Sequence, residues 1–461
     1  MTVDRRQEVE LCLQEFTDVL TDMPGCTDMI EHDIQLTTRE PVRVKGYPIP
    51  FHSQPVVQEE VDKMLQLGVI EPSNAPFASP IVLIKKKDDT IRFCIDFRQL
   101  NKVTVFDAEP MPNIEEMFVR LSRYKYFSKL DLSKGYWQVP LSDNAKPMTA
   151  FESSRGGLFQ FTRMPFGLVN APATFCRLMR RLLKGLEHSY SFIDDILVLT
   201  ITWSEHLVAL RELLTRLRKS GLTARPSKCS IGYCRLEILG HVLGNVHSLE
   251  PVPDKLKAIQ EAARPKTKKQ VRSFLGVVGF YRKFVPNFAA IATPLTDLTK
   301  KGQPNQIIWG DSQENAFQSL KACLVKSPIL RLPDLDKTFI LRVDASEIGL
   351  GAVLLQENDE EKFPVAYASR KLLSREKNYS VIEKECLAVV WGVTKFHRYL
   401  FGKEFVLETD HQPLTYLNKA KMANSRVMRW ALSLQPYRMV IRAIPGRENV
   451  GADYLSRLEG E

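Results

Sequence analysis

Several features that would direct a chain to a membrane, to secretion or to zinc chemistry are missing from these 461 residues. There is no run of about 18 apolar residues, so no membrane-spanning helix is expected. The sequence does not start with the apolar stretch of a secretory signal peptide. Its eight cysteines are scattered, with no C-x-x-C pair and no cysteine–histidine cluster, which argues against a zinc knuckle. These absences predict a reduced, intracellular protein.

Charge is distributed unevenly along the chain. The formal net charge is +10, yet residues 1–40 contain ten acidic and only three basic residues, a local balance of −7 that leaves +17 for the remainder. A strongly basic body is typical of proteins that bind a polyanion such as a nucleic acid. A merely soluble basic protein would have the same composition, so charge alone leaves both interpretations open.

The chain is longer than one hydrophobic core usually organises, and we expect two to four domains. Near the start, the pattern predicts a short acidic amphipathic helix over 8–20. A second helical pattern over 56–67 ends at Gly68, and two β-rich runs at 81–84 and 91–97 flank a polar turn. Strands and helices alternate in the following stretch, which predicts an α/β or α+β domain.

The second half of the chain changes character twice. Residues 250–330 have a mostly helical pattern that prolines interrupt. After them come strands over 338–343 and 351–355, a helix over 380–400, a strand over 405–409, a further helix and a closing strand. This order predicts a compact domain in which helices cover a sheet.

Two adjacent carboxylates, Asp194 and Asp195, stand between two apolar β-prone runs. Asp-Asp is a poor two-residue hairpin turn, because the favoured turn types require Gly or Asn with positive φ. Two like charges beside apolar strands also repel each other, and a divalent cation such as Mg²⁺ would relieve that repulsion. An exposed acidic turn is an equally good interpretation of these two residues alone.

A third acid favours the metal interpretation. Asp131 lies near the end of the strand-like run 126–132, and a metal pair that brackets phosphoryl transfer needs carboxylates from separate strands. Two ions about 3.5–4 Å apart would activate a primer 3′-hydroxyl and hold a triphosphate. The basic residues Lys85–Lys87 and Arg92 lie on a hairpin that could close over that triphosphate.

An ordered series of motifs resembles a known family. Segments 130–138, 164–175 and 192–195 resemble, in the right order, three core motifs of reverse transcriptases. The likeness covers nearly the whole chain and is carried further by segments 92–98, 100–101, 239–241 and 267–288. The last of these is particularly similar to gypsy-type long-terminal-repeat retrotransposons.

The resemblance implies a role for individual residues. Asp131 and Asp194 would be the main metal ligands, supported by Asp195. The residues that would contact the nucleotide are Lys86 and Arg92 at its triphosphate, Tyr136 beneath its sugar, Phe166 and Gly167 in its pocket, and Lys228 near the departing pyrophosphate. Core packing of Tyr136 and a solvated loop at Lys228 are competing interpretations. The family usually has tyrosine where this chain has Phe192, and we expect altered efficiency or fidelity from that change rather than inactivity.

Four more acids are spread through the last part of the chain. Asp344 and Asp410 end strands, and Glu385 flanks the buried face of the helix over 380–400, whose apolar positions repeat every three or four residues. Asp453 begins a short segment near the end. Acids at strand ends beside a helical glutamate could hold two metal ions and activate water against a phosphodiester. Scattered acids are more often surface charges, so the motifs around them decide.

Those motifs resemble the ribonuclease H domain of retrotransposons, and they lie at 343–346, 383–388, 409–411 and 445–457. The resemblance implies Asp344, Glu385, Asp410 and Asp453 as the acids of that domain. Glu385 is preferred to Glu383 because it directly precedes Cys-Leu-Ala in the family pattern. The histidine-bearing loop of some ribonucleases H is not evident before Asp453, so product release or metal handling would lack that side chain.

The segment between these two regions is rich in positive charge. Seven basic residues and no acid fall within twenty positions, and they are Arg264, Lys266, Lys268, Lys269, Arg272, Arg282 and Lys283. Phe280 and Tyr281 interleave with them, which suits a track for a nucleic-acid duplex. A solvated helical face is the competing interpretation.

Together these features predict an α/β and α+β multidomain protein with the fold of a right-hand polymerase. We expect an acidic lead segment at 1–40, fingers and palm at 41–245, a helical thumb or connection at 246–334, and an RNase H-like α/β domain at 335–461. The expected function is RNA- and DNA-directed DNA synthesis with degradation of RNA in RNA–DNA hybrids. It would use two Mg²⁺ ions per active site, or Mn²⁺, and its partners would be an RNA template, a DNA primer, the hybrid and dNTPs.

Two rivals from other classes stay open at this point. A nucleic-acid-binding relic would have lost its carboxylates, whereas all seven are present; a structural subunit would use the fold only for assembly. No Asp-Thr/Ser-Gly protease motif and no integrase signature occur, so we expect a piece of a longer polyprotein. Its place would be a cytoplasmic particle or the nucleus. Primer, host and oligomeric state are not indicated.

Overall fold

The computed structural model describes residues 3–85, 91–153, 156–244, 248–325, 330–358, 361–410 and 425–445. Backbone contacts divide the chain into two compact units. Unit 1 comprises Met1–Met117 and Tyr124–Leu236, and unit 2 comprises Phe118–Arg123 and Glu237–Glu461. No helix in the described ranges is long and apolar enough to cross a bilayer. The eight cysteines are all free thiols.

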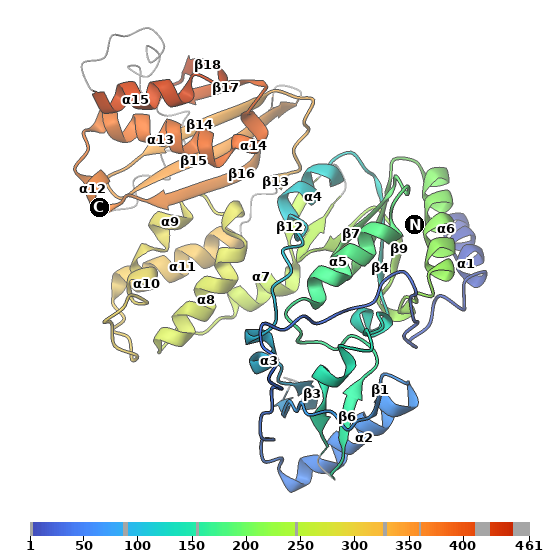
Figure 1. Cartoon of the computed structure of the whole chain (residues 1–461). Helices are drawn as coiled ribbons and strands as arrows, with labels where there is room; N and C mark the ends of the chain where they lie inside the picture. The colour runs from blue at the N-terminus through green and yellow to red at the C-terminus, as the bar shows by residue number, and fades with distance from the viewer. Residues whose placement is uncertain are drawn as a thin grey trace. The chain divides into compact units, whose positions relative to one another are not determined.

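Unit 1 combines helices with three separate sheets (Figure 1). Its helices are α1 (Val3–Gln14), α2 (Gln54–Gln66), α3 (Arg98–Lys102), the first half of α4 (Ile114–Leu121), α5 (Ala171–Leu182) and α6 (Trp203–Lys219). Its strands form the sheets β1-β6-β5 (Ile70–Pro72, Leu158–Phe161, Phe151–Glu152), β2-β3 (Ile81–Lys85, Ile91–Ile95) and β7-β8-β4-β9 (Ser189–Phe192, Asp195–Thr200, Tyr126–Asp131, Ser230–Tyr233).

The local sequence explains several of these elements. The helix predicted over 56–67 is confirmed as α2, and Gly68 follows it with φ +62°, a conformation that costs glycine little. The predicted β-runs pair as the hairpin β2-β3. Helix α6 begins with a capping box, in which the Thr202 hydroxyl accepts from the Glu205 amide and the Glu205 carboxylate accepts from the Thr202 amide.

The β7-β8-β4-β9 sheet forms the centre of unit 1. Helix α6 packs on it through the fully buried His206, whose ring lies 2.6 Å from the Ser128 hydroxyl of β4 and 2.9 Å from the Thr200 hydroxyl of β8. Burial lowers the pKa of His206 to about 4, so its ring is neutral at physiological pH. The core around this sheet extends to residues far away in the sequence, including Val57, Phe97 and Phe175.

The acidic lead segment packs along α6 (Figure 1). Its helix α1 lies earlier than the predicted 8–20, because the chain after Gln14 turns and buries Phe16 and Val19 in the core of unit 1. Its acids pair with basic residues further along the chain, and these ion pairs are Glu15–Arg211, Asp18–Arg218 and Asp22–Arg225. The negative charge of the lead segment is therefore partly matched inside the same unit.

After α1 the chain crosses the end of α6 at very close range. A Cβ atom added to Gly25 would lie 2.1 Å from the Gly221 carbonyl oxygen, and one added to Gly221 would lie 2.3 Å from the Cys26 carbonyl oxygen. Residues 19–27, here called the strap, then hydrogen-bond to neighbouring loops: the Ser133 hydroxyl donates to the Thr21 carbonyl at 2.5 Å. The buried Gln138 side chain bonds both backbone groups of Thr223, and the Gln138 backbone carbonyl accepts from the Thr27 amide of the strap at 2.9 Å.

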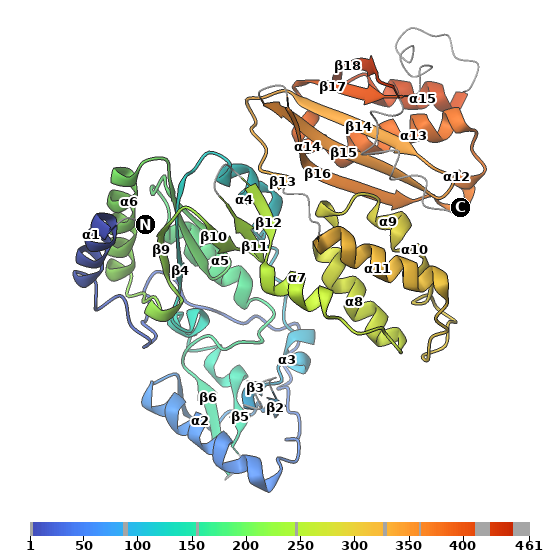
Figure 2. The ribbon, with the colours of Figure 1, turned by 180° about the vertical axis from the view of Figure 1, so that it is seen from behind.

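Unit 2 begins with a small sheet and a group of helices (Figure 2). The sheet has the order β10-β11-β12-β13 (Leu236–Ile238, His241–Leu243, Ser248–Pro251, Leu330–Arg331). The helices are α7 (Pro253–Gln260), α8 (Lys268–Phe280), α9 (Phe288–Ile291), α10 (Thr293–Asp297) and α11 (Asp311–Val325). A capping box between Thr267 and Gln270 starts α8. The mostly helical pattern predicted for 250–330 is confirmed.

The last part of unit 2 is a five-stranded sheet covered by helices on one face (Figures 1 and 2). Its order is β16-β15-β14-β17-β18 (Glu361–Lys371, Gly349–Asn358, Phe339–Ala345, Glu404–Thr409, Arg438–Ala443). The covering helices are α13 (Val381–Lys395), α14 (His397–Leu400) and α15 (Ser425–Leu434), and the short α12 (Ser374–Lys377) precedes them. The apolar stripe predicted for α13 is buried, with Cys386 1% and Val393 0% exposed. Strand β16 was not predicted.

Candidate active sites

The first site is built at the end of the central sheet of unit 1. Strands β4 and β8 are antiparallel, and their register places Asp131 directly opposite Asp195. Like charges directly opposite each other destabilise a sheet, so such a pair needs a counter-charge. Asp194 precedes β8 in the hairpin loop. The structure therefore brings together the three acids that the sequence singled out, and we call them the Asp131 corner.

The hairpin loop that carries Asp194 is strained. Phe192 pairs with Asp195, so the two loop residues are Ile193 and Asp194, and not the two aspartates. Ile193 has φ +54°, a left-handed conformation that a β-branched side chain adopts only at a cost of about 1–3 kcal/mol. Strain of this kind is concentrated at functional sites, because the surrounding structure must enforce it.

Two lysines supply positive charge to the corner. Lys129 Nζ lies 3.3 Å from Asp195 Oδ2, and Lys228 Nζ lies 3.5 Å from Asp131 Oδ2. Burial raises the pKa of Asp195, and the charges of Asp194 and Asp131 add to that rise, whereas Lys129 opposes it. Lys228 was named from the sequence, but Lys129 was missed. Strand alternation could have found it, since residues 129 and 131 share a face of β4.

A stack of aromatic rings borders this corner. The Tyr136 ring stacks on the Phe166 ring with centroids 5.0 Å apart, and its edge meets Phe175 at 5.3 Å. Burial, with a smaller effect of Asp194, raises the pKa of Tyr136 to about 12, so its hydroxyl stays protonated. Gly167 follows with φ +100°. Tyr136 and Phe166, both predicted to contact the nucleotide, thus pack against each other, and with Phe175 they form what we call the aromatic wall.

Three predicted site residues cannot be placed. Lys86 and Asp453 lie outside the described residues. Arg92 lies in β3, paired with Ile84, but its side chain is outside the described part of the structure. Their roles stay predictions.

The second site lies at one edge of the five-stranded sheet in unit 2. Strands β14 and β17 are parallel neighbours in which Arg342 pairs with Glu408. Asp344 and Asp410 each follow this pair by two residues, so they share a face and an edge of the sheet. Glu385 reaches the same place from α13, whose start is fixed by a capping box between Ser380 and Glu383. Asp344 and Glu385 are both 6% exposed.

In this site, Glu385 has a strongly shifted pKa. Burial, together with the charges of Asp344 and Asp410, raises its pKa to about 8. Its Oε2 atom is buried and has no hydrogen-bond partner among the described residues. A buried carboxylate oxygen without a partner, close to two other carboxylates, is what a divalent cation would satisfy.

In both sites the described acids lie near one another, but their side chains do not yet point to one common position. No three His, Cys, Asp or Glu side chains in the described ranges already converge as a chelating group. The donor type nevertheless fits a hard cation, because carboxylate oxygens are the ligands that Mg²⁺ prefers. The unsatisfied Glu385 oxygen and the facing pair Asp131 and Asp195 are the two observations that carry this fit.

The basic segment is only partly available for a partner. Arg264 pairs with Glu314 at 3.8 Å, so the positive charges are not all unpaired as the sequence indicated. Lys268 and Arg272 donate to backbone carbonyls of residues 299–303. Arg282 donates to the Ser369 carbonyl at 3.0 Å, and Lys283 lies 4.2 Å above the Phe118 ring. For Lys266 and Lys269, no side-chain partner is seen in the part of the chain that the structure describes.

Comparison with known proteins identifies two domain families in this chain. The family "Reverse transcriptase (RNA-dependent DNA polymerase)" matches residues 84–278, and the family "RNase H-like domain found in reverse transcriptase" matches residues 334–437. The first match contains the Asp131 corner and the aromatic wall. The second contains Asp344, Glu385 and Asp410. Members of both families generally use divalent metal ions.

Curated relatives carry both domains within longer chains. The retrovirus-related Pol polyproteins from transposon 297 and transposon gypsy of Drosophila melanogaster are 39% and 35% identical over 94% and 92% of this chain. The transposon Tf2-3 polyprotein of Schizosaccharomyces pombe is 31% identical over 97% of it. The chain spans only 41%, 42% and 34% of these three relatives.

Solved structures support the fold. A foamy viral protease-reverse transcriptase in complex with double-stranded DNA matches 96% of this chain and 79% of its own with a TM-score of 0.86 and 24% identity. The same kind of protein in complex with an RNA/DNA hybrid matches with a TM-score of 0.81, over 96% of this chain and 61% of its own. The chain therefore contains a region of the reverse transcriptase family followed by a region of the RNase H-like family, and over nearly its whole length it is similar to gypsy-type retrotransposon Pol polyproteins.

Proposed function

We propose that this chain copies RNA and DNA templates into DNA at the Asp131 corner and degrades the RNA of the resulting hybrid at the Asp344, Glu385 and Asp410 site. The observation that carries the polymerase half is the register of β4 and β8, which sets Asp131 opposite Asp195 beside a strained turn. The unsatisfied Glu385 oxygen carries the nuclease half.

Each site would hold two Mg²⁺ ions, which Mn²⁺ could replace. In unit 1 the ligands would be Asp131 and Asp194 with support from Asp195, and in unit 2 they would be Asp344, Glu385, Asp410 and Asp453. When bound, the ions lower the pKa of an attacking hydroxyl or water and stabilise charge on the phosphate. In the absence of ions, Lys129 and Lys228 offset the negative charge of the first site, at 3.3 and 3.5 Å from its carboxylates.

The remaining residues of unit 1 would bind and select the nucleotide. Tyr136 would lie beneath the sugar and exclude a 2′-hydroxyl, and its stacking on Phe166 would hold the ring in place. Lys86 and Arg92 would contact the triphosphate. Lys228 would lie near the departing pyrophosphate, which its distance from Asp131 supports.

Primer extension on an RNA template tests the proposal directly. Extension of a DNA primer by the chain should require a divalent cation and stop in EDTA. Incubation with a preformed RNA–DNA hybrid should cleave the RNA strand under the same conditions. Binding of hybrid without metal-dependent extension or cleavage would instead favour a binding relic or a structural subunit.

A further inference from the structure

Two asparagines join the turn at Phe166 to the loop after α3. The Asn101 amide nitrogen donates to the Gly167 carbonyl at 2.8 Å, and its oxygen accepts from the Val169 backbone amide at 2.9 Å. Asn170 makes the reciprocal pair, donating to the Val105 carbonyl at 2.8 Å and accepting from the Asp107 amide at 3.1 Å. Each side chain thus bridges two backbone groups that lie two residues apart.

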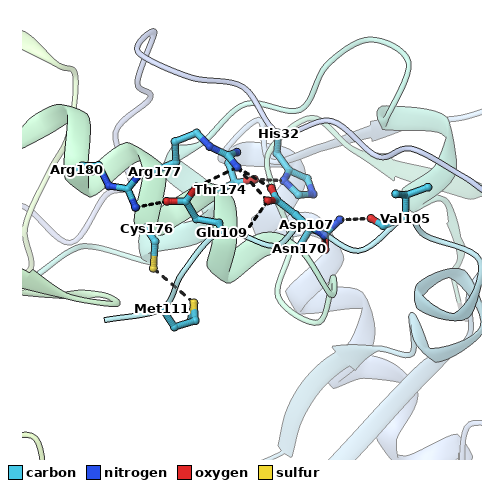
Figure 3. Close-up of polar contacts among 10 residues, drawn as sticks. All are labelled: His32, Val105, Asp107, Glu109, Met111, Asn170, Thr174, Cys176, Arg177 and Arg180. Carbon is cyan, nitrogen blue, oxygen red and sulfur yellow. Dashed lines mark hydrogen bonds and ion pairs between the residues drawn. The ribbon is translucent and has the colours of Figure 1, made fainter. Parts of the chain in front are cut away.

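The loop at Val105–Glu109 is itself held rigidly. Arg177 of α5 donates to both carboxylate oxygens of Asp107, at 2.8 and 3.1 Å, and this contact is the main cause of the lowered pKa of Asp107. Arg177 and Arg180 also pair with Glu109 (Figure 3). Asn170 is 8% exposed and lies inside this network. Of the two segments that Asn101 and Asn170 join, the one at Val105–Glu109 is therefore held in place by α5.

The turn that Asn101 holds needs such support. Gly167 has φ +100°, and because glycine can enter and leave such a conformation at little cost, contacts from outside the turn are needed to fix it; Phe166 remains 46% exposed. The Phe166 ring nevertheless stacks on Tyr136 at 5.0 Å. The carbonyl that Asn101 fixes belongs to the residue directly after Phe166, so losing this hydrogen bond would free the backbone of the turn that carries the Phe166 ring.

We propose that Asn101 is a positioning residue for sugar selection: by fixing the Phe166–Gly167 turn, it fixes the ring against which Tyr136 rests. This inference rests on the proposed polymerase function of the Asp131 corner. Discrimination between deoxynucleotides and ribonucleotides then depends on a side chain that does not touch the nucleotide. The alternative is that Asn101 only stabilises the fold.

Asn101→Asp is the sharpest test, because the two side chains have nearly the same shape. The aspartate still accepts from Val169, but it sets a carboxylate oxygen against the Gly167 carbonyl in place of a donor. Single-nucleotide insertion should show a ratio of kcat/KM for dNTP over rNTP that falls about 5- to 10-fold, the scale of one lost hydrogen bond. The KM for dNTP should rise while kcat stays within about threefold of the parent.

Two further variants separate positioning from folding. Gln99→Ala, at an exposed position of the same helix, should leave the ratio unchanged. Asn101→Ala should lower it as the aspartate does, with circular dichroism confirming that each variant is folded. A merely structural role would reduce the folded fraction and leave the dNTP-to-rNTP ratio as it was.

A double-mutant cycle with Tyr136→Ala tests the route of the effect. If Asn101 acts through Tyr136, Asn101→Asp should not change discrimination further in the Tyr136→Ala background. Independent, additive effects would overturn the inference, as would a folded Asn101→Asp protein with unchanged discrimination. If the parent protein inserts dNTP selectively, the proposed polymerase function holds whatever the Asn101 variants show. If the parent inserts no nucleotide, both the proposed function and the inference on Asn101 are wrong.

Discussion

At the scale of single residues, the Asp131 corner depends on a lysine inside the sheet. Burial favours the protonated form of Asp195, and Lys129 at 3.3 Å counters this by stabilising the ionised form. An ionised carboxylate is the form that coordinates a cation. Lys129 thus favours the ionised form of Asp195, which is the form that the proposed metal ion would bind.

The buried His206 predicts how the stability of unit 1 responds to acid. Its pKa is lowered to about 4 in the folded chain, against an ordinary 6.5, so the unfolded chain binds the proton first. The stabilisation is present above pH 6.5 and is lost as the pH falls from 6.5 towards 4, by up to about 3 kcal/mol. Urea unfolding of unit 1, followed by tryptophan fluorescence at pH 7 and pH 5, measures this loss.

His206→Gln isolates this contribution from that of the carboxylates. The glutamine keeps a donor and an acceptor for Ser128 and Thr200 but cannot titrate, so its stability should fall less between pH 7 and pH 5. The exposed His52→Gln should behave like the parent. Equal losses in His206→Gln and the parent would show that His206 does not titrate as stated.

The sequence predicted the acids of both sites and the supporting Lys228, but it did not predict Lys129 or Asn101. Asp131 and Asp195 were found because each stands at the end of an apolar run, which is a pattern that the sequence alone shows. The Lys129 contact could have been inferred from strand alternation. Asn101 could not, because its partners Gly167 and Val169 lie more than sixty residues away and follow no periodicity.

At the scale of elements, β16 was missed because its place in the sheet depends on pairing with β15 and not on its own local pattern. The sequence of β16 contains Pro364 and several charged residues, which argue against a strand. It is tolerated because β16 is an edge strand and its register with β15 shifts beside the proline, between Leu354 and Leu355. Elements with strong local signals, such as α2 and the stripe of α13, were predicted correctly.

The strap predicts a strong effect of one methyl group. Gly25→Ala would place a Cβ 2.1 Å from the Gly221 carbonyl oxygen, a backbone atom that cannot move aside cheaply. We expect a loss of about 1–3 kcal/mol in the stability of unit 1, with primer extension reduced more than cleavage of a preformed hybrid. The strap contacts the loop that follows Asp131 through Ser133, which Gln138 also holds. A shift of the strap should therefore displace the Asp131 corner and lower its activity.

Gly46→Ala is the matched control for this variant. A Cβ there would meet only a flexible Glu152 oxygen at 3.8 Å, and its stability should equal that of the parent or slightly exceed it. Thermal unfolding and paired activity assays on both variants make the comparison. Equal stability of Gly25→Ala and the parent would mean that the crossing relaxes without cost.

The basic segment predicts a salt effect that is confined to two of its residues. Lys266 and Lys269 should contribute counterion release on hybrid binding, whereas Lys268 and Arg272 are engaged with carbonyls of the neighbouring loop. The double variant Lys266→Ala and Lys269→Ala should flatten the slope of log affinity against log salt. The slope per phosphate is about 0.9 for B-form DNA, and the hybrid is not B-form, so only the direction is predicted.

The double variant Lys255→Ala and Lys257→Ala removes the same charge from α7. Lys257 there already lies 4.0 Å from Glu261, so this control should keep the parental slope. If both double variants changed the slope equally, net charge rather than the basic segment would explain the binding.

At the scale of the whole molecule, the two candidate active sites lie in different compact units. One two-ion site spans only a few ångströms, so each must rely on its own carboxylates. Asp194→Asn should abolish primer extension and spare cleavage of a preformed hybrid, and Glu385→Gln should do the reverse. Both variants should stay folded, since removing one of several crowded negative charges relieves repulsion.

Paired extension and cleavage assays on each variant measure this separation, with circular dichroism as the folding control. A folded variant that loses both activities would show that the two sites are coupled. A variant that loses neither would show that the substituted acid is not part of its site.

The pairing of the lead segment with distant residues also bears on how the chain is made. During synthesis the strap leaves the ribosome about two hundred residues before its partners at Gly221 and Ala224, because the partners lie that far along the chain. At about 5–20 residues per second, the nascent chain waits on the order of 10–40 s before unit 1 can close. Through that interval we expect Phe16 and Val19 to be exposed, and the surplus of acidic groups around them should reduce association of the growing chain with its neighbours on the polysome.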